Sequence, residues 1–317
     1  MRRRQVVQLL ASAMSPHLTR AMNRINGRRG GVILVFHEIT GPRLETQLNQ
    51  VAEAYSFVSL DEFVSRLAAG KSTNGVCAIT FDDGIGPVTE DASAIAVARG
   101  WPMTFYLPTR YLDTGEPYWF LELDLLLERA PGKGFEFDGG WHSLDGPTAR
   151  AGASVFLRSY FKKRTSVQEV TDSLRALRRA LLENESRPMD MPVPAPVSWE
   201  RVRQLAAREE LSFQAHTVNH LALSRLSEEG LISEMESSRV RIEEVTGRPV
   251  NHFCYPYGSP NEVGRIAPDF VRSRFRSATT TDRGRCAPGV DLALLPRVPL
   301  DGADSEEVVA FKVGSAR

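Results

Sequence analysis

Apolar residues along the chain fall into two alternating patterns, short unbroken runs and longer stretches with helical spacing. The unbroken runs are rich in β-branched residues, as is typical of strands buried on both faces. The first part of the chain predicts strand 31–38, helices 44–55 and 60–69, strand 76–81, helix 90–99 and strand 103–107. This alternation favours parallel strands joined by helical crossovers, an α/β fold.

The alternation stops between residues 113 and 197, where helix 119–129, a small hairpin at 135–141 and helix 167–185 lead into a proline-rich linker. We interpret 113–197 as a helical insertion that lies over the top of the main domain. It would serve as a lid or in substrate specificity, with structural padding as the alternative.

After the insertion the alternation resumes. The predicted elements are helix 199–208, strand 211–214, helix 228–246, strands 251–255, 275–279 and 292–296, and a final helix 306–312. About seven strand–helix units favour a barrel of parallel strands over an open sheet.

Composition is that of a soluble globular protein, with 42% apolar and 25% charged residues in 317. The formal net charge of zero argues against nucleic acid as the main partner. The cysteines Cys77, Cys254 and Cys286 are odd in number and widely spaced. They predict no disulfide framework, which favours a reducing compartment.

Residues 1–30 are basic, and Leu10, Met14, Leu18 and Met22 follow a helical spacing. They predict a basic amphipathic helix that either lies on an anionic membrane surface or packs on the domain. No run approaches the roughly 20 apolar residues of a membrane span, and no signal-peptide pattern follows the basic start. We expect a cytoplasmic protein, with peripheral contact at the inner membrane surface if this helix binds lipid.

Two adjacent acids, Asp82 and Asp83, end the buried run 76–81. Buried charges are costly unless each is compensated, and adjacent strand residues point to opposite sides. The two acids therefore need different partners, which suits one metal ligand beside one general base. An Asp-Asp-Gly turn with a helix-capping acid is the alternative.

His216 and His220 lie four residues apart, directly after a predicted strand. On a helical turn both imidazoles can reach one metal ion. The pattern differs from the HExxH zinc helix because Thr217 stands where that motif has its glutamate. Two histidines and one carboxylate leave open positions on zinc, as catalytic sites do.

Three segments together resemble the first three motifs of the polysaccharide deacetylases, the NodB-homology carbohydrate esterases of family 4. They are TFDDG at 80–84, HTVNH at 216–220 and YPYG at 255–258. The resemblance covers about 31–110 and 198–300. It implies an irregular (β/α) barrel of about seven strands and a divalent metal, most often Zn²⁺, with Co²⁺, Ni²⁺ or Mn²⁺ as alternatives.

The resemblance also implies roles within a catalytic domain spanning 31–317. Asp82 matches the family's general base and Asp83 its metal-binding aspartate. His216 and His220 match the two metal-binding histidines.

The third motif implies substrate contacts. Tyr257 lies where the family uses a tyrosine backbone N–H to hold the oxyanion, and we assign Pro256 and Tyr257 to substrate binding. Trp119, at the start of the insertion, is our candidate for stacking on a sugar ring, with ordinary packing as the alternative.

The sequence departs from the family pattern at two places. Cys254 stands where the third motif usually has the arginine that orients the base, and 294–298 lacks the usual late Leu-x-His. The strand ending in His37 resembles the N-terminal histidine strand of circularly permuted members. We hypothesise that His37 is the general acid and that Arg297 replaces the missing arginine beside Asp82. A strand-capping histidine and a surface salt bridge are the alternatives.

The function that this resemblance implies is a metal-dependent hydrolase that removes N-acetyl groups from an amino sugar. Its partner would be an acetylated polysaccharide, oligosaccharide or lipid-linked glycan precursor, and not nucleic acid. An O-acetyl esterase, a non-sugar amide hydrolase and a non-catalytic barrel that binds glycans or a partner protein remain as alternatives.

Overall fold

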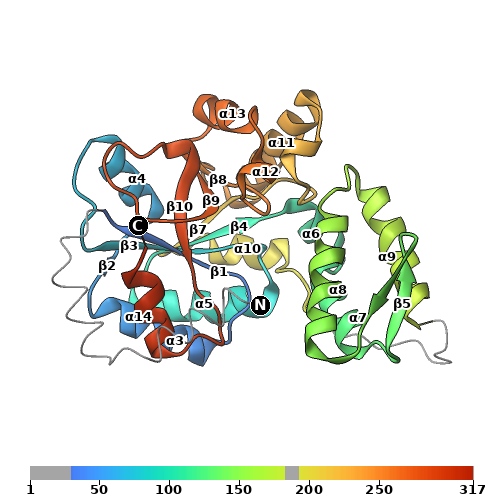
Figure 1. Ribbon diagram of the computed structural model, residues 1–317. Helices are drawn as coiled ribbons and strands as arrows, with labels where there is room; N and C mark the ends of the chain where they lie inside the picture. Colours follow the sequence, from blue (N-terminus) through green and yellow to red (C-terminus); the bar gives the residue numbers. More distant parts are fainter. Residues whose placement is uncertain (1–29, 183–192, 317) are drawn as a thin grey trace.

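A closed ring of parallel strands forms the centre of the computed structural model, which describes residues 30–182 and 193–316 (Figure 1). Its seven strands are β1 (Val32–Phe36), β3 (Val76–Phe81), β4 (Met103–Leu107), β7 (Leu211–Ala215), β8 (His252–Cys254), β9 (Ser277–Arg283) and β10 (Leu295–Pro299). Strand β1 pairs in parallel with both β10 and β3, which closes the ring. The predicted barrel of about seven parallel strands is therefore confirmed. Strand β2 (Ser56–Phe57) pairs with the first residues of β3, outside the ring.

Helices cover the outside of the barrel and one of its ends. They are α3 (Gly41–Ala52), α4 (Leu60–Ala68), α5 (Gly86–Arg99), α6 (Thr109–Thr114), α10 (Trp199–Leu205), α11 (Glu228–Thr246), α12 (Pro260–Val263), α13 (Ala267–Arg274) and α14 (Glu306–Gly314), with 3₁₀ turns at Leu223–Arg225 and Leu292–Leu294. The starts of α4 and α10 are capped by serine side chains: Ser59 accepts from Glu62 N and Ser198 from Arg201 N.

Alternate strand residues face two different environments. Leu34 and Ile79 belong to the large cluster shared with the outer helices, whereas Ile33 and Ala78 pack with Phe63 of α4. Because successive side chains of a strand point to opposite sides, the second group fills the barrel interior. Helix α4 therefore plugs the end at which the strands begin.

A row of four phenylalanines crosses the outer face of the barrel. Phe36, Phe81, Phe105 and Phe213 are register neighbours on β1, β3, β4 and β7, with ring centroids 5.0–5.5 Å apart. All four are buried. The row fixes the lateral positions of the strands whose ends carry the motif acids and histidines.

The last two barrel strands lie further along the chain than the sequence predicted. Strand β9 begins at Ser277, and residues 292–294 form a 3₁₀ turn, so that β10 begins only at Leu295. The turn starts where the Asp291 side chain accepts a hydrogen bond from Ala293 N. This shift places Arg297 in the middle of a strand rather than beyond its end.

A smaller α/β unit is inserted after α6 and stands at the right of Figure 1. It consists of α7 (Trp119–Arg129), the antiparallel hairpin β5 (Gly134–Phe137) and β6 (Gly140–Ser143), α8 (Gly146–Phe161) and α9 (Val167–Leu182). Leu123, Leu126, Leu157 and Leu177 form its own fully buried core. Helix α8 was not predicted from the sequence. The unit packs at the carboxyl ends of the strands, where the ring of Phe120 lies 5.5 Å from that of His220.

The predicted N-terminal helix at 1–30 lies outside the described residues, apart from Gly30. Among the helices that the structure does describe, none combines the length and the apolar character needed to cross a bilayer.

We expect Phe105→Ala to destabilise the protein by about 3–5 kcal/mol, because it removes the ring that contacts both Phe81 and Phe213 in a packed core. Urea unfolding measures this change. A matched truncation at the exposed Trp141 should have little effect. Equal effects of the two substitutions would contradict this account of the barrel.

Candidate active site

The three motifs meet at the carboxyl ends of neighbouring barrel strands. Asp82 directly follows β3, His216 follows β7, and Tyr255 follows β8. Positive φ angles outside glycine occur at five described residues, Asp83, Asp138, Thr217, His220 and Tyr257, and four of these five lie in the motifs. Strained backbone concentrates where a structure must hold groups in one geometry, as functional sites do.

The segment from His216 to His220 is a loop, not the helical turn that the spacing predicted. Thr217 has φ 67° and His220 has φ 56°, which no helix allows. The two imidazoles nevertheless lie next to each other, edge to face, with ring centroids 4.8 Å apart. The loop therefore brings both histidines together by a different route.

Asp82 is held by Arg297 in a buried, two-pronged ion pair. Arg297 Nη1 donates to Oδ1 and Nη2 to Oδ2, each at 2.7 Å. Arg297 is fully buried, so the alternative of a surface salt bridge does not apply. Burial alone would raise the pKa of Asp82, but the guanidinium outweighs it and holds that pKa well below its usual range. Asp82 is therefore ionised.

Further contacts fix the guanidinium inside the barrel. Arg297 Nε donates to Thr280 O at 2.9 Å, and Nη1 also donates to Thr80 Oγ1 at 3.2 Å. Its Nη2 lies 3.2 Å from Cys254 Sγ. The small thiol leaves the space that the guanidinium from β10 fills. Arg297 thus lies in the position beside Asp82 that our hypothesis gave it.

His37 stands at the open side of the same carboxylate. It follows the end of β1, its side chain is about half exposed, and its Nε2 lies 3.5 Å from Asp82 Oδ2. His37 therefore lies between the buried carboxylate of Asp82 and the solvent.

Asp83 faces the two motif histidines rather than Arg297. Its Oδ1 lies 3.5 Å from His216 Nε2 and 3.3 Å from His220 Nε2. His216 Nδ1 is 2.7 Å from Cys254 O, so this nitrogen is the N–H donor and Nε2 is the nitrogen directed at Asp83. The predicted division of the two acids between different partners is present in the structure.

This group fits a divalent cation. Asp83 Oδ1, the atom that lies 3.3–3.5 Å from both histidine Nε2 atoms, is buried without a hydrogen-bond partner among the described residues. Burial lowers the pKa of His220 to about 3, so its imidazole is neutral. A carboxylate oxygen and two imidazole nitrogens then converge, a donor set that suits zinc and similar metals.

A second group of possible ligands overlaps the first. Asp82, His216 and Cys254 also lie close enough to hold one ion, as do Asp83, His216 and His220. Both oxygens of Asp82 accept from Arg297, whereas Asp83 Oδ1 accepts no hydrogen bond from any described residue. The Asp83 group is therefore the better metal site.

Tyr257, in the third motif, contacts His220. Its hydroxyl donates to His220 O at 3.1 Å, and the two rings meet edge to face with centroids 4.9 Å apart. The next residue, Gly258, has φ 60°, and a Cβ there would lie 2.6 Å from Thr281 N, so only glycine fits. Pro256 is buried between Tyr255 and Tyr257.

Trp119 occupies the position of a packing residue, contrary to the prediction that it stacks on a sugar. It is 3% exposed, and its ring stacks on Phe161 with centroids 4.9 Å apart. Its centroid lies 6.5 Å from that of Tyr257. The indole supports Tyr257 from behind instead of facing a substrate.

Two further residues, Tyr118 and Glu234, contact the site and were not predicted from the sequence. The Tyr118 hydroxyl donates to Asp83 O. Glu234, on α11, accepts hydrogen bonds from the loop between the histidines. A signal for Glu234 was present, because it falls on the buried face of the predicted helix together with Leu231, Met235 and Ser238.

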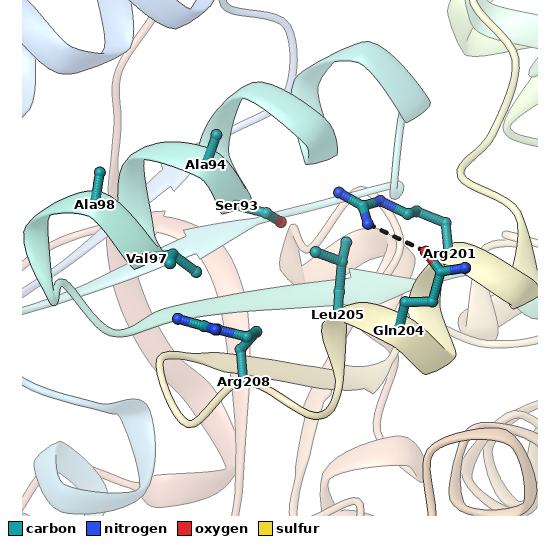
Figure 2. A pocket seen from close by; sticks show the side chains of 8 residues that line it. All are labelled: Ser93, Ala94, Val97, Ala98, Arg201, Gln204, Leu205 and Arg208. Carbon is teal, nitrogen blue, oxygen red and sulfur yellow. Dashed lines mark hydrogen bonds between the residues drawn. The ribbon is translucent and has the colours of Figure 1, made fainter.

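A surface pocket of about 360 Å³ lies away from this site, between α5 and α10 (Figure 2). Its lining residues are Ser93, Ala94, Val97, Ala98, Arg201, Gln204, Leu205 and Arg208. Arg201 is already paired with Glu90 through hydrogen bonds of 2.7–3.0 Å. The pocket shares no residue with the motifs.

A parallel barrel that gathers two carboxylates and two histidines at its strand ends is the arrangement of a barrel hydrolase. A family model described as polysaccharide deacetylase matches residues 69–267, and the chain belongs to this family. The recognition made from the motifs is thereby confirmed. No curated protein matches the chain significantly.

Solved structures of deacetylases share this fold. The deacetylase PplD of Streptococcus pyogenes in complex with acetate is 15% identical, with a TM-score of 0.58, and the match covers 90% of this chain and 98% of that one. IcaB from Ammonifex degensii is 16% identical, with the same coverage and TM-score. A de-N-acetylase from Aggregatibacter actinomycetemcomitans is 14% identical, with a TM-score of 0.54 and coverages of 89% and 99%.

We expect Arg297→Leu to cost about 3–5 kcal/mol of stability at neutral pH, because it leaves Asp82 buried without its partner. The folded-state pKa of Asp82 lies below its unfolded value of about 3.9, so the pair stabilises wild type above that pH and less as pH falls. Without Arg297, burial raises that pKa, and the deficit should shrink on acidification. Urea unfolding of wild type and Arg297→Leu at several pH values measures this difference in stability. A deficit that stays constant with pH would contradict the ion-pair account.

Proposed function

We propose that this deacetylase-family protein is a metal-dependent hydrolase that removes the N-acetyl group of an amino sugar in a polysaccharide, oligosaccharide or lipid-linked glycan precursor. One observation carries the proposal: Asp83, His216 and His220 converge on one point, directly beside the ionised Asp82. In this proposal the protein acts in the cytoplasm, with its first thirty residues at the inner membrane surface, as their sequence suggests.

Asp83, His216 and His220 would hold the metal, and nitrogen and oxygen donors of this kind favour zinc, with cobalt, nickel or manganese as alternatives. The metal would supply Lewis-acid chemistry at the acetyl carbonyl. The hydrogen bond from His216 Nδ1 to Cys254 O keeps Nε2 directed at the site.

Asp82 is the proton acceptor in this proposal. Water that attacks the acetyl carbonyl must lose a proton, and an ionised carboxylate at the site can take it. Arg297 fixes both oxygens of Asp82 and keeps the group ionised, so it orients the base without touching substrate. It does from β10 what the family arginine does from the third motif.

Tyr257 and His37 would act on the two ends of the bond that breaks. The backbone N–H of Tyr257 would donate to the negative oxygen that forms on the carbonyl, as preorganised donors do in acyl transfer. His37 would give a proton to the sugar nitrogen as it leaves, which yields acetate and a free amine. Its exposed position beside Asp82 supports this role.

The relatives support the choice of substrate. The family is that of polysaccharide deacetylases. Among structures with this fold, one is a de-N-acetylase and another binds acetate, the product of the proposed reaction. Arg297 and His37 both contact Asp82, so an arginine and a histidine stand beside the proposed base although the motifs lack them. This supports catalysis over a barrel that only binds glycans.

We expect His220→Ala to lose both bound metal and acetate release, because it removes one of three converging donors. Elemental analysis and an acetate assay on N-acetylated oligosaccharides measure the two losses on the same samples. His142→Ala, a substitution in the inserted hairpin, is the control and should keep its metal. A folded wild type without metal would contradict the assignment of the three ligands.

We expect Asp82→Asn to lower acetate release by roughly 10²–10⁴-fold, the contribution of a general base, while metal stays bound. His37→Gln should lower it as well, with a smaller loss for leaving groups that need less protonation. Acetate release from N-acetyl and from O-acetyl substrates tests this, since the oxygen that leaves an O-acetyl group needs protonation less than the nitrogen that leaves an N-acetyl group. If Asp82→Asn retained full turnover, Asp82 would not be the base.

A further inference from the structure

We propose that Glu234 is a positioning residue for the metal site. From α11, its carboxylate holds the loop between His216 and His220 in the shape that directs both imidazoles at Asp83. This inference rests on the proposed metal function and adds a residue that neither the family motifs nor the ligand set contains.

The loop needs an external support because its backbone is unfavourable on its own. Thr217 and His220 both have positive φ angles, and Thr217 is β-branched, for which this region is sparsely populated. The loop also lacks the internal hydrogen bonds of a helix. Its shape must therefore be imposed by groups outside the loop.

Glu234 supplies acceptors for the donors of this loop. Its Oε2 accepts from Val218 N at 3.0 Å and from Asn219 N at 2.8 Å, and its Oε1 accepts from the Asn219 side chain. Glu234 is 8% exposed, so water is a poor substitute for these contacts.

The connection reaches the metal ligand itself. Glu234 holds Asn219 through both its backbone amide and its side chain, and Asn219 directly precedes His220, whose own amide donates to Thr217 Oγ1 at 2.9 Å. On the opposite side, the carbonyls of Thr217 and Val218 accept from the amides of Thr109 and Arg110, at 3.2 and 3.0 Å. Amides and carbonyls of the loop are thus held by two different helices, α11 and α6.

A matched pair of substitutions on α11 tests the proposal. Glu234→Gln removes the charge and one acceptor from the loop. Glu243→Gln is the control, because Glu243 also accepts a backbone amide, from Val250 at 3.0 Å, and pairs with Arg239. Both changes remove a carboxylate of the same helix that accepts from a backbone amide, but only Glu234 faces the histidine loop.

The readouts are Zn²⁺ affinity of the metal-free full-length protein, the visible absorption of its Co²⁺ form, and hydrogen exchange of the Val218, Asn219 and His220 amides. Glu234→Gln should weaken Zn²⁺ binding by about 10–100-fold, the usual effect of groups that orient metal ligands. It should also alter the Co²⁺ spectrum and speed exchange in the loop. Glu243→Gln should leave all three unchanged.

Wild-type Zn²⁺ affinity and loop exchange in Glu234→Gln would overturn the proposal. If that variant does not fold, Asn219→Ala removes the side-chain donor to Glu234 Oε1 and leaves α11 unchanged; wild-type Zn²⁺ affinity and loop exchange in this second variant would overturn the proposal as well. If wild type binds no metal, the proposed function fails, and the exchange data alone decide whether Glu234 holds the loop.

Discussion

The ion pair between Asp82 and Arg297 is the constraint on which the site depends. A carboxylate inside a barrel is costly, and the cost is offset only by a partner that meets both oxygens. Because Arg297 comes from β10 and Asp82 from the end of β3, with β1 between them, the pair also ties the closure of the barrel to the site. Asp83, one residue further, is left to the histidines.

The functional groups are supported by backbone that is unfavourable in isolation. Asp83, Thr217, His220 and Tyr257 all have positive φ angles, and each lies where neighbouring contacts fix it. Tyr118 binds Asp83 O, Glu234 binds the histidine loop, and Tyr257 binds His220 O. These contacts come from different helices and loops, so the geometry of the site depends on several elements at the carboxyl ends of the strands.

Much of the fold could be predicted because unbroken apolar runs define buried strands directly. The bounds of Val76–Phe81, Met103–Leu107 and Glu228–Thr246 agree with the structure residue by residue. The shape of the 216–220 loop could not be predicted, since a spacing of four suits a helix and only tertiary contacts enforce positive φ. The support from Glu234 and the burial of Trp119 depend likewise on elements distant in sequence, which local patterns do not report.

The inserted unit brings a second hydrophobic core to the edge of the site. Trp119 and Phe120 of α7 contact Tyr257 and His220, and Lys162, at the end of α8, lies 4.6 Å from the Tyr257 ring centroid. Small cores open more readily than large ones, through local unfolding that leaves the rest of the molecule intact. Heat would therefore loosen the surroundings of Tyr257 through the insertion while the barrel still stands, so that inactivation precedes melting.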